Sequence, residues 1–286
     1  FTMPGFVAQM KKLNLPSSIF VDNTASAEVA HFYENILDGS ISISTPNKIA
    51  SSSSFLQYER LKKLADRRGV KFCYETNVGA GLPILSTLND LLASGDRILK
   101  IEGILSGTLS FIFNHFRAGT RFSDIVKQAK TLGLTEPDPR IDLSGKDVAR
   151  KLVILAREIS LPLEVEDVEI VPFLPKNCLE APNVEVFLKE LADLDGSFEA
   201  FRADFEKQGR APRMIAKLED GRATIGLEGV AETHPFFHLD GSDNMVVFTT
   251  ERYRERPLVV RGPGAGAEVT AAGVFAEILT IGSFLK

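Results

Sequence analysis

The densest group of reactive side chains in this sequence lies between residues 136 and 151. Four carboxylates and one of its two lysines form the pattern: Glu136, Asp138, Asp142, Asp147 and Lys151. Carboxylates can hold the ammonium and hydroxyl groups of a small amino acid, and a lysine can then protonate an oxygen of that molecule. Because Pro137 and Pro139 disfavour helix, we expect the first three acids to project from a stiff, extended loop. The pattern favours proton transfer on a small polar substrate.

The last two of these residues belong to a predicted helix. Apolar periodicity predicts an amphipathic helix over Asp147–Ile159, with Ser144 as its N-cap. Asp147 and Lys151 are four residues apart on one face, and Lys151 lies at the margin of the buried stripe. Partial loss of hydration there would lower the pKa of the lysine and suit it to proton transfer. The alternative interpretation is an ordinary solvated ion pair at the start of a helix.

The elements before this segment alternate between strand and helix. Strands are predicted at Ile19–Asp22, Ile41–Ser44 and Val70–Glu75, and helices at Ala27–Leu37 and Phe55–Arg68. This alternation predicts a parallel, doubly wound sheet in residues 1–77. A helix predicted over Val269–Phe284 would return to it.

The pattern changes after residue 77, where strands and helices no longer alternate. We expect strands at Arg97–Ile104, Met245–Thr250 and Leu258–Val260, helices at Ser110–Arg117 and Phe122–Leu132, and a hairpin joining Met214–Leu218 to Ala223–Val230. Asp220-Gly221 between two alternating runs is typical of a hairpin turn. We therefore expect an α/β protein of two units, residues 1–77 with 255–286, and residues 78–254.

Composition limits the classes of partner. The net charge is −5, from 33 basic and 38 acidic residues, which argues against nucleic acid because phosphate-binding domains carry a basic excess. Cys73 and Cys178 are two lone thiols, as in a reducing compartment. The histidines have no metal-ligand spacing. No continuous apolar run reaches about 18 residues and no leader opens the chain. We expect a cytoplasmic protein with no membrane partner.

Six segments resemble the motifs of homoserine dehydrogenases. They are Thr135–Pro139, Asp142–Lys151, Glu75–Pro83, Gly103–Thr108, Thr45–Lys48 and Val269–Val274. The stretch from His234 to Gly266 resembles the form that is fused behind an aspartate kinase in bifunctional enzymes. The resemblance implies NAD(P)-dependent interconversion of L-aspartate 4-semialdehyde and L-homoserine, on the route to threonine and methionine. It also implies NADP or NAD as cofactor, a monovalent cation (Na⁺ or K⁺), a homodimer or larger assembly, and fusion to a kinase domain.

The resemblance assigns roles to individual residues. Lys151 and Lys48 match catalytic positions, and Lys151 matches the general acid. Substrate-binding positions match Glu136, Asp142, Asp147, Thr108 and Gly107. Cofactor-binding positions match Thr24, Asn47, Lys48, Gly133 and Gly273. Glu75, Val78, Ala80 and Leu82 match a cation site built mainly from backbone carbonyls.

Each of these assignments has a structural alternative. Lys48 can be a surface lysine, Thr24 a helix N-cap, and Gly79-Ala80-Gly81 a plain turn in which glycine permits positive φ.

One motif of the family is missing near the start of the chain. The family begins with a strand, a Gly-x-Gly-x-x-Gly turn and a helix, which hold the pyrophosphate. We interpret the later Gly262–Gly266 as a return element that packs near the cofactor. The expectation is therefore a fragment, with a partial Rossmann-like, incomplete dinucleotide-binding domain and an α+β catalytic and dimerisation domain with a mixed sheet. Two alternatives stay open: a non-catalytic ligand-binding or dimerisation fragment, and another nicotinamide oxidoreductase of a related amino-acid aldehyde.

Overall fold

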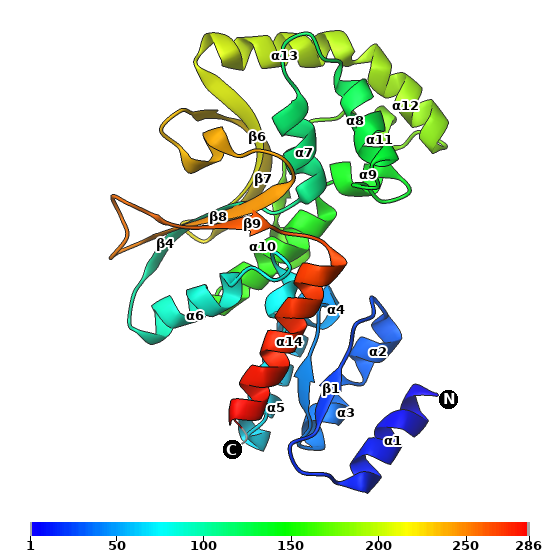
Figure 1. Cartoon of the computed structure of the whole chain (residues 1–286), viewed down its shortest axis with the longest axis vertical. Coiled ribbons are helices and arrows are strands. Elements are labelled where there is room, and N and C mark those ends of the chain that lie inside the picture. The colour runs from blue at the N-terminus through cyan, green and yellow to red at the C-terminus, as the bar shows by residue number, and fades with distance from the viewer. Residues whose placement is uncertain (1, 285–286) are drawn as a thin grey trace. The chain divides into compact units, whose positions relative to one another are not determined.

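The computed structural model describes residues 2–284. The chain forms two compact units, of which unit 1 comprises residues 1–90, 153–165 and 265–286, and unit 2 comprises residues 91–152 and 166–264 (Figure 1). A parallel sheet and a separate mixed sheet confirm the expected fold class. The units divide at other positions than the expected 77/78 and 254/255. One reason is that the boundary falls within helix α10 (Lys146–Glu158), whose first half belongs to unit 2 and whose second half belongs to unit 1.

Unit 1 is built on a three-stranded parallel sheet. Its order is β1 (Ile19–Val21), β2 (Ser42–Ser44) and β3 (Phe72–Cys73). The register aligns Phe20 with Ile43 and Ile43 with Phe72, so these side chains share one face. The ring of Tyr33 packs edge-on against Phe20 and Phe72 on that face. On the opposite face, Ser44 meets Glu277 of the C-terminal helix, so helices cover both faces of the sheet.

The helices of unit 1 agree with the sequence patterns only in part. They are α1 (Met3–Leu13), α2 (Ala27–His31), α3 (Tyr33–Asp38), α4 (Lys48–Ser51), α5 (Phe55–Arg68), α6 (Ile84–Ala93, whose end belongs to unit 2) and α14 (Ala267–Phe284), with a 3₁₀ turn η1 (Glu75–Asn77). The helix expected over 27–37 is interrupted at Phe32 and forms two short helices. Helix α1 was not predicted.

Helix α14 is long and apolar enough, by length and composition alone, to cross a membrane. Its buried residues Gly273, Val274, Glu277 and Ile281 form one stripe at helical spacing. Because that stripe includes a carboxylate bonded to Ser44 in the sheet of unit 1, we interpret α14 as a packing helix.

Unit 2 is built on a six-stranded mixed sheet of order β5-β7-β6-β4-β8-β9. The strands are β4 (Ile98–Ile104), β5 (Glu169–Ile170), β6 (Arg210–Glu219), β7 (Arg222–Ala231), β8 (Asp243–Thr250) and β9 (Leu258–Pro263). Only the β5–β7 pair is parallel. Asp220 and Gly221 have φ of 50° and 75°, which confirms the expected hairpin between β6 and β7.

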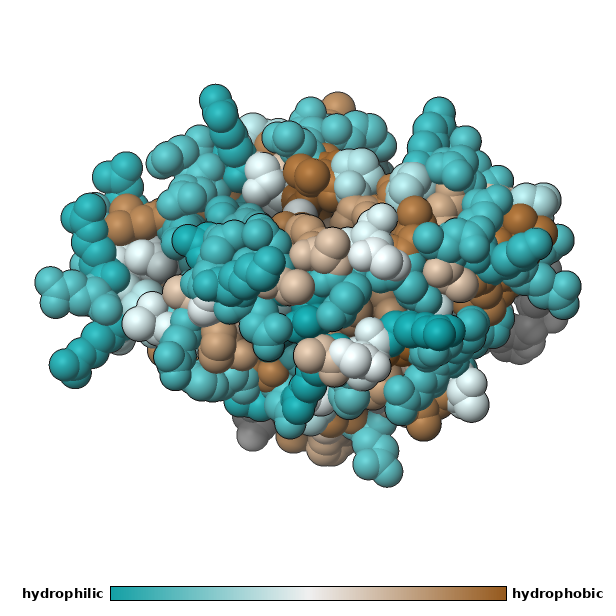
Figure 2. Space-filling view, turned by 90° about the horizontal axis from the view of Figure 1, so that it is seen from above, coloured by the Kyte–Doolittle hydropathy of each residue, from teal (hydrophilic) through white to brown (hydrophobic). Residues whose placement is uncertain are grey.

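The helices of unit 2 include several that were not predicted. They are α7 (Gly107–His115), α8 (Phe122–Thr131), α9 (Pro139–Leu143), the first half of α10, α11 (Lys176–Leu179), α12 (Val184–Asp193) and α13 (Asp195–Lys207), with 3₁₀ turns η2 (Val165–Asp167, whose first residue belongs to unit 1) and η3 (Pro235–His238). Helices α11 to α13 had no counterpart in the sequence interpretation. Helices α7 and α13 pack against β6. Figure 2 shows that hydrophilic side chains dominate the visible face, with separate hydrophobic patches.

The acidic segment from Glu136 to Asp142, expected to be an extended loop, is partly helical. Pro139 is the first residue of α9, a position where its missing N–H costs nothing, and Asp138 caps the helix by accepting from the backbone N of Arg140. The expectation of an extended loop was therefore wrong for residues 139–143. Helix α10 begins at Lys146, whose backbone N donates to Oγ of Ser144 at 3.4 Å, so Ser144 contacts the start of the helix as expected, with Gly145 (φ of 71°) between them.

Candidate functional site

Lys151 is held by two oxygen atoms in unit 2. Its side chain points from the first half of α10, and the residue is only 9% exposed. The Nζ donates to the carbonyl of Leu105 at 2.7 Å and lies 3.0 Å from Oδ2 of Asp147. Asp147 and Lys151 thus share a helix face as expected and form the i,i+4 ion pair of the alternative interpretation, and the carboxylate of Asp147 is half-exposed. An ammonium group with one buried and one solvent-facing oxygen partner has a fixed position at the edge of the core.

Asp142 connects three segments of unit 2. Its Oδ1 lies 3.1 Å from Oγ1 of Thr108, and its Oδ2 accepts from the backbone N of Glu136 at 2.9 Å. The hydroxyl of Thr108 also contacts the carbonyl of Leu134. Helix α9, the segment 134–136 and the start of α7 are therefore joined through one carboxylate.

The connection between β4 and α7 is where these contacts meet. Lys151 reaches it at Leu105, and Asp142 reaches it at Thr108. Ser106 caps α7 by accepting from the backbone N of Leu109 at 3.2 Å. Gly107 is the first helical residue, and a Cβ there would lie 3.2 Å from the carbonyl oxygen of Ser242. Residues far apart in the sequence thus gather around one strand–helix junction.

Glu136 and Gly133 lie in the segment before α9. The side chain of Glu136 is exposed, and its carboxylate makes no hydrogen bond to any residue that the structure describes. Gly133 follows α8 with φ of 70°, and the backbone N atoms of Gly133 and Leu134 donate to the carbonyls of Lys130 and Ala129. This pattern is a Schellman motif, which gives Gly133 a structural reason independent of any ligand.

Asp138 has a local role. It pairs with Arg140 at 2.5 Å, and this hydrogen bond holds the pKa of Asp138 below its usual range. Only some of the carboxylates of the acidic segment are therefore available for a ligand.

The candidate cofactor residues of unit 1 follow the carboxyl ends of β1 and β2. Thr24 is exposed, and its Oγ1 accepts from the backbone N of Ser26. Ser26, not Thr24, is the N-cap of α2. Lys48 is half-buried and begins α4. Ligands of parallel α/β sheets bind at this end of the strands, so the position of Thr24 and Lys48 suits a cofactor.

A buried polar network underlies these two residues. Asp22 is 2% exposed, and its Oδ2 accepts from Tyr33 at 2.5 Å and from Asn47 Nδ2 at 3.0 Å. Asn47 also donates to the carbonyl of Ser26 and accepts from Ile49 N, so both N–H groups of its amide are engaged. Burial, and then Asp22, raise the pKa of Tyr33 far above its usual value. The sequence interpretation missed Asp22 and Tyr33; the polar Asp at the end of an apolar strand was the available signal.

The turn after η1 holds the candidate cation residues. The carboxylate of Glu75 accepts from the backbone N atoms of Leu85 and Ser86, each at 2.7 Å, so it caps α6. Burial raises the pKa of Glu75, although these N–H groups oppose the shift. Gly79 and Ala80 have φ of 76° and 52°, which turns successive carbonyls in different directions. The carboxylate of Glu75 is thus engaged by the backbone, and the carbonyl oxygens of this turn are the candidate cation ligands.

Helix α14 lies closely against this turn. A Cβ on Gly273 would lie 2.5 Å from Cγ2 of Thr76, so only glycine fits. One turn further along, Glu277 accepts from the hydroxyl of Ser44 and from the backbone N of Glu75, each at 2.5 Å. Burial raises the pKa of Glu277 to about 7. Glu277 was not singled out from the sequence, since an acid inside an apolar helix gives no local signal of its partners.

The structure thus places the sequence-predicted residues in two sets. Unit 2 brings together Lys151, the predicted catalytic residue, and the substrate-binding candidates Gly107, Thr108, Asp142 and Asp147, with the backbone of Glu136. Unit 1 holds Thr24, Asn47, Lys48 and Gly273 with the cation candidates. Gly133, expected beside the cofactor, belongs to unit 2.

Gly264 also has a packing role in unit 2. A Cβ at this position would collide with the amide of Asn244, a fully buried residue. The glycine-rich stretch after β9 therefore permits close packing.

Known proteins resemble this chain over most of its length. A family model for homoserine dehydrogenase matches residues 83–279. A chloroplastic bifunctional aspartokinase/homoserine dehydrogenase 2 of Arabidopsis thaliana is 46% identical over 273 residues, which are 95% of this chain and 30% of that protein. The homoserine dehydrogenase of Schizosaccharomyces pombe is 45% identical over 294 residues, covering 100% of this chain and 78% of that protein. The chain therefore spans less than a third of the bifunctional relative.

Solved structures share the fold. A Candida auris protein described as of unknown function has a TM-score of 0.94 and 37% identity, with 99% of this chain and 81% of that chain covered. A hyperthermophilic archaeal homoserine dehydrogenase in complex with NADPH has a TM-score of 0.75 and 24% identity, with 99% and 75% covered. The second likeness concerns the fold alone. With the family model matched over residues 83–279 and the S. pombe relative covered over most of its length, this chain belongs to the homoserine dehydrogenase family.

Proposed function

We propose that this protein interconverts L-aspartate 4-semialdehyde and L-homoserine with NADP or NAD as cofactor. The observation that supports this most directly is the junction between β4 and α7, where Lys151 contacts Leu105 and Asp142 contacts Thr108. Family membership supports the choice of reaction. The junction supports it further, because a candidate proton donor lies there beside several substrate-binding candidates.

Lys151 is the proposed general acid. The carbonyl of Leu105 and the carboxylate of Asp147 fix the ammonium group in one position, and a positioned proton donor lowers the barrier of a carbonyl reduction. In the forward direction Lys151 gives a proton to the aldehyde oxygen as that oxygen gains negative charge. In the reverse direction it accepts the proton of the homoserine hydroxyl.

Glu136 and Asp147 are the proposed ligands of the substrate ammonium group, since both carboxylates are exposed. Asp142 acts mainly by holding Thr108 and the backbone of Glu136 in place, because both of its oxygens accept from the protein. Gly107 and Thr108 present the first backbone N–H groups of α7, which suits a carboxylate.

The cofactor is proposed to bind at Thr24 and Lys48 in unit 1. A bound nicotinamide supplies or accepts the hydride in such a reaction. The exposed hydroxyl of Thr24 and the half-buried Lys48 at the start of α4 fit a polar, phosphate-bearing ligand. The amide N–H groups of Asn47 are engaged, so Asn47 supports these neighbours rather than donating to the ligand. The backbone at Gly133 and at Gly273 is proposed to lie against the nicotinamide half of the cofactor.

A monovalent cation, Na⁺ or K⁺, is proposed for the turn after η1. Carbonyl oxygens of Glu75, Val78, Ala80 and Leu82 would be its ligands. The left-handed residues Gly79 and Ala80 and the engaged carboxylate of Glu75 fit such a carbonyl cradle.

We further propose a homodimer or larger assembly through the mixed sheet of unit 2, and cytoplasmic action on a small-molecule substrate. The free thiols Cys73 and Cys178 suit a reducing compartment. Relatives include bifunctional enzymes, so a covalently attached aspartate kinase domain in the whole protein is part of the proposal.

The test is oxidation of NADPH with L-aspartate 4-semialdehyde, followed at the cofactor absorbance. We expect turnover in the full-length protein and its loss in Lys151→Ala. Absence of turnover in the full-length protein would refute the activity. Turnover in the full-length protein but not in the 286-residue chain would support the alternative of a non-catalytic ligand-binding fragment.

A further inference from the structure

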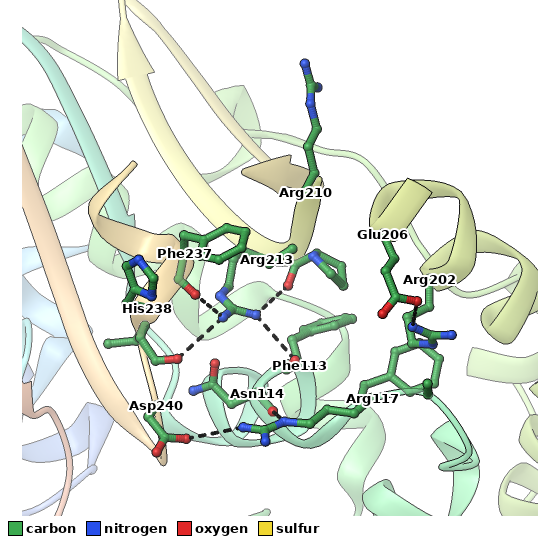
Figure 3. Close-up of a pocket in the computed structure, with 15 residues that line it drawn as sticks. Phe113, Asn114, Arg117, Arg202, Glu206, Arg210, Arg213, Phe237, His238 and Asp240 are labelled. Atoms are coloured by element: carbon green, nitrogen blue, oxygen red, sulfur yellow. Dashed lines mark hydrogen bonds and ion pairs between the residues drawn. The ribbon is translucent and has the colours of Figure 1, made fainter. Parts of the chain in front are cut away.

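A cavity of about 610 Å³ in unit 2 is lined by none of the residues proposed above (Figure 3). Its walls come from the end of α7, from α13, from the start of β6 and from residues 237–240 around the end of η3. Four arginines line it, against two carboxylates: Arg117, Arg202, Arg210 and Arg213, with Glu206 and Asp240. Its volume is typical of a small-molecule site, and the excess of arginine favours an anion.

Arg213 supplies a buried positive charge that forms no ion pair within residues 2–284. The residue is 7% exposed, and its guanidinium donates to five backbone carbonyls, the nearest being those of Phe236, Phe237 and Pro212 at 2.9 Å. No carboxylate among the residues that the structure describes lies within ion-pair distance of it. Burial, and then the charge of Arg117, lower the pKa of Arg213 to about 10. Carbonyl dipoles satisfy its hydrogen bonds, but its charge remains directed at the cavity.

Arg117 can supply direct contacts. Its Nε donates to the carbonyl of Asn114, and its only ion pair within residues 2–284 is to Asp240 at 3.9 Å, with both side chains largely exposed. Such a long, exposed pair is weak. By contrast, Arg202 is engaged by Glu199 and Glu206. In Figure 3 the Arg210 side chain points away from Arg213, so we assign the direct contacts to Arg117.

Asn114 adds a requirement for a hydrogen-bond donor. It is 5% exposed, and its Nδ2 donates to the carbonyl of Gly241 at 2.8 Å, which fixes the orientation of the amide. Its Oδ1 is buried and has no partner among the described residues. In Figure 3 the amide points toward the guanidinium of Arg213. A buried acceptor without a donor is costly, so a ligand hydroxyl at this oxygen would be favourable.

We propose that this cavity binds a small oxyanion that carries a hydroxyl group, namely a phosphate species or a hydroxycarboxylate. Arg117 pairs with the anionic oxygens, Arg213 provides a fixed positive field, and Asn114 Oδ1 accepts from the hydroxyl. The site lies wholly in unit 2 and does not depend on the proposed dehydrogenase activity.

Titration calorimetry of the purified protein with matched anions tests the proposal. In mildly acidic buffer inorganic phosphate keeps a protonated oxygen and sulfate does not, and tricarballylate is citrate without its hydroxyl. We expect phosphate to bind more tightly than sulfate, or citrate more tightly than tricarballylate, and the pair that differs identifies the kind of ligand. Arg117→Gln should weaken binding of the preferred anion about tenfold, because it removes one charge-assisted pair.

Arg97→Gln is the matched control, because Arg97 is also exposed and also has one long ion pair, to Glu251 at 3.6 Å. Asn114→Ala should abolish the preference for the hydroxyl-bearing anion, with folding checked by circular dichroism. Equal weakening by Arg117→Gln and Arg97→Gln would overturn the site, because it would reduce the binding to general surface charge. A hydroxyl preference that survives in a folded Asn114→Ala protein would overturn the role of Asn114.

Discussion

Oδ1 of Asp142 lies 3.1 Å from Oγ1 of Thr108, a residue 34 positions earlier, while Oδ2 of the same carboxylate holds the backbone N of Glu136. One side chain therefore positions two candidate substrate-binding residues. We expect Asp142→Asn to raise KM for the semialdehyde about tenfold with a smaller effect on kcat, because an amide keeps only one acceptor oxygen and cannot accept from both Thr108 Oγ1 and Glu136 N. Steady-state kinetics measure both. A fall in kcat at unchanged KM would instead place Asp142 in the chemical step.

Lys151 is expected to affect the chemical step itself. Lys151→Met removes the proposed proton donor and should lower kcat by about a hundredfold or more, with folding retained. Lys146→Met is the control, since Lys146 is exposed at the first position of the same helix. The measurement is NADPH oxidation across a range of pH. Comparable losses in both variants would exclude a specific role for Lys151.

Gly133 distinguishes a helix cap from a cofactor contact. Its φ of 70° is left-handed, so Gly133→Ala should lower the free energy of unfolding by about 1 kcal/mol. Asparagine tolerates this conformation, so Gly133→Asn should be nearly as stable as the parent. If the proposed approach to the nicotinamide is correct, Gly133→Asn will nevertheless raise KM for NADPH. An unchanged KM in the stable Asn variant would leave Gly133 with the capping role alone.

Gly273 is expected to be essential for the packing of α14. A Cβ at this position would lie 2.5 Å from Cγ2 of Thr76, so Gly273→Ala should lower the melting temperature. Thr76→Ser removes that methyl group, and the double variant should recover part of the loss. Thermal unfolding of the four proteins measures the coupling. Additive effects of the two substitutions would show that this contact does not limit packing.

Glu277 should make stability depend on pH. Its folded pKa of about 7 lies above its ordinary value of 4.5, so between these limits the folded state binds more protons than the unfolded state. The contribution is present below pH 4.5 and is lost as pH rises toward 7, by up to about 3 kcal/mol. Glu277→Gln cannot titrate, so its stability should fall less between pH 5 and 7.5. Urea unfolding at several pH values tests this, and equal slopes for parent and variant would contradict it.

Local sequence patterns predicted much of the fold. Strand and helix periodicity predicted the parallel and mixed sheets, and Asp220-Gly221 predicted the β6–β7 hairpin, because side-chain alternation and turn conformation depend on neighbouring residues. The spacing of Asp147 and Lys151 predicted their shared helix face for the same reason. The same local reasoning failed at Pro139, where proline begins a helix instead of preventing one.

Tertiary structure alone decided which distant groups meet. The sequence identified Lys151 and Asp142 as candidates, but it did not show that they contact Leu105 and Thr108 at a single junction, because those contacts span 46 and 34 residues. Burial likewise raises the pKa of Glu277, against the opposing hydrogen bond from Ser44, 233 residues away. Periodicity determines the face of an element on which a residue lies, whereas packing determines what that face meets and how much water remains there.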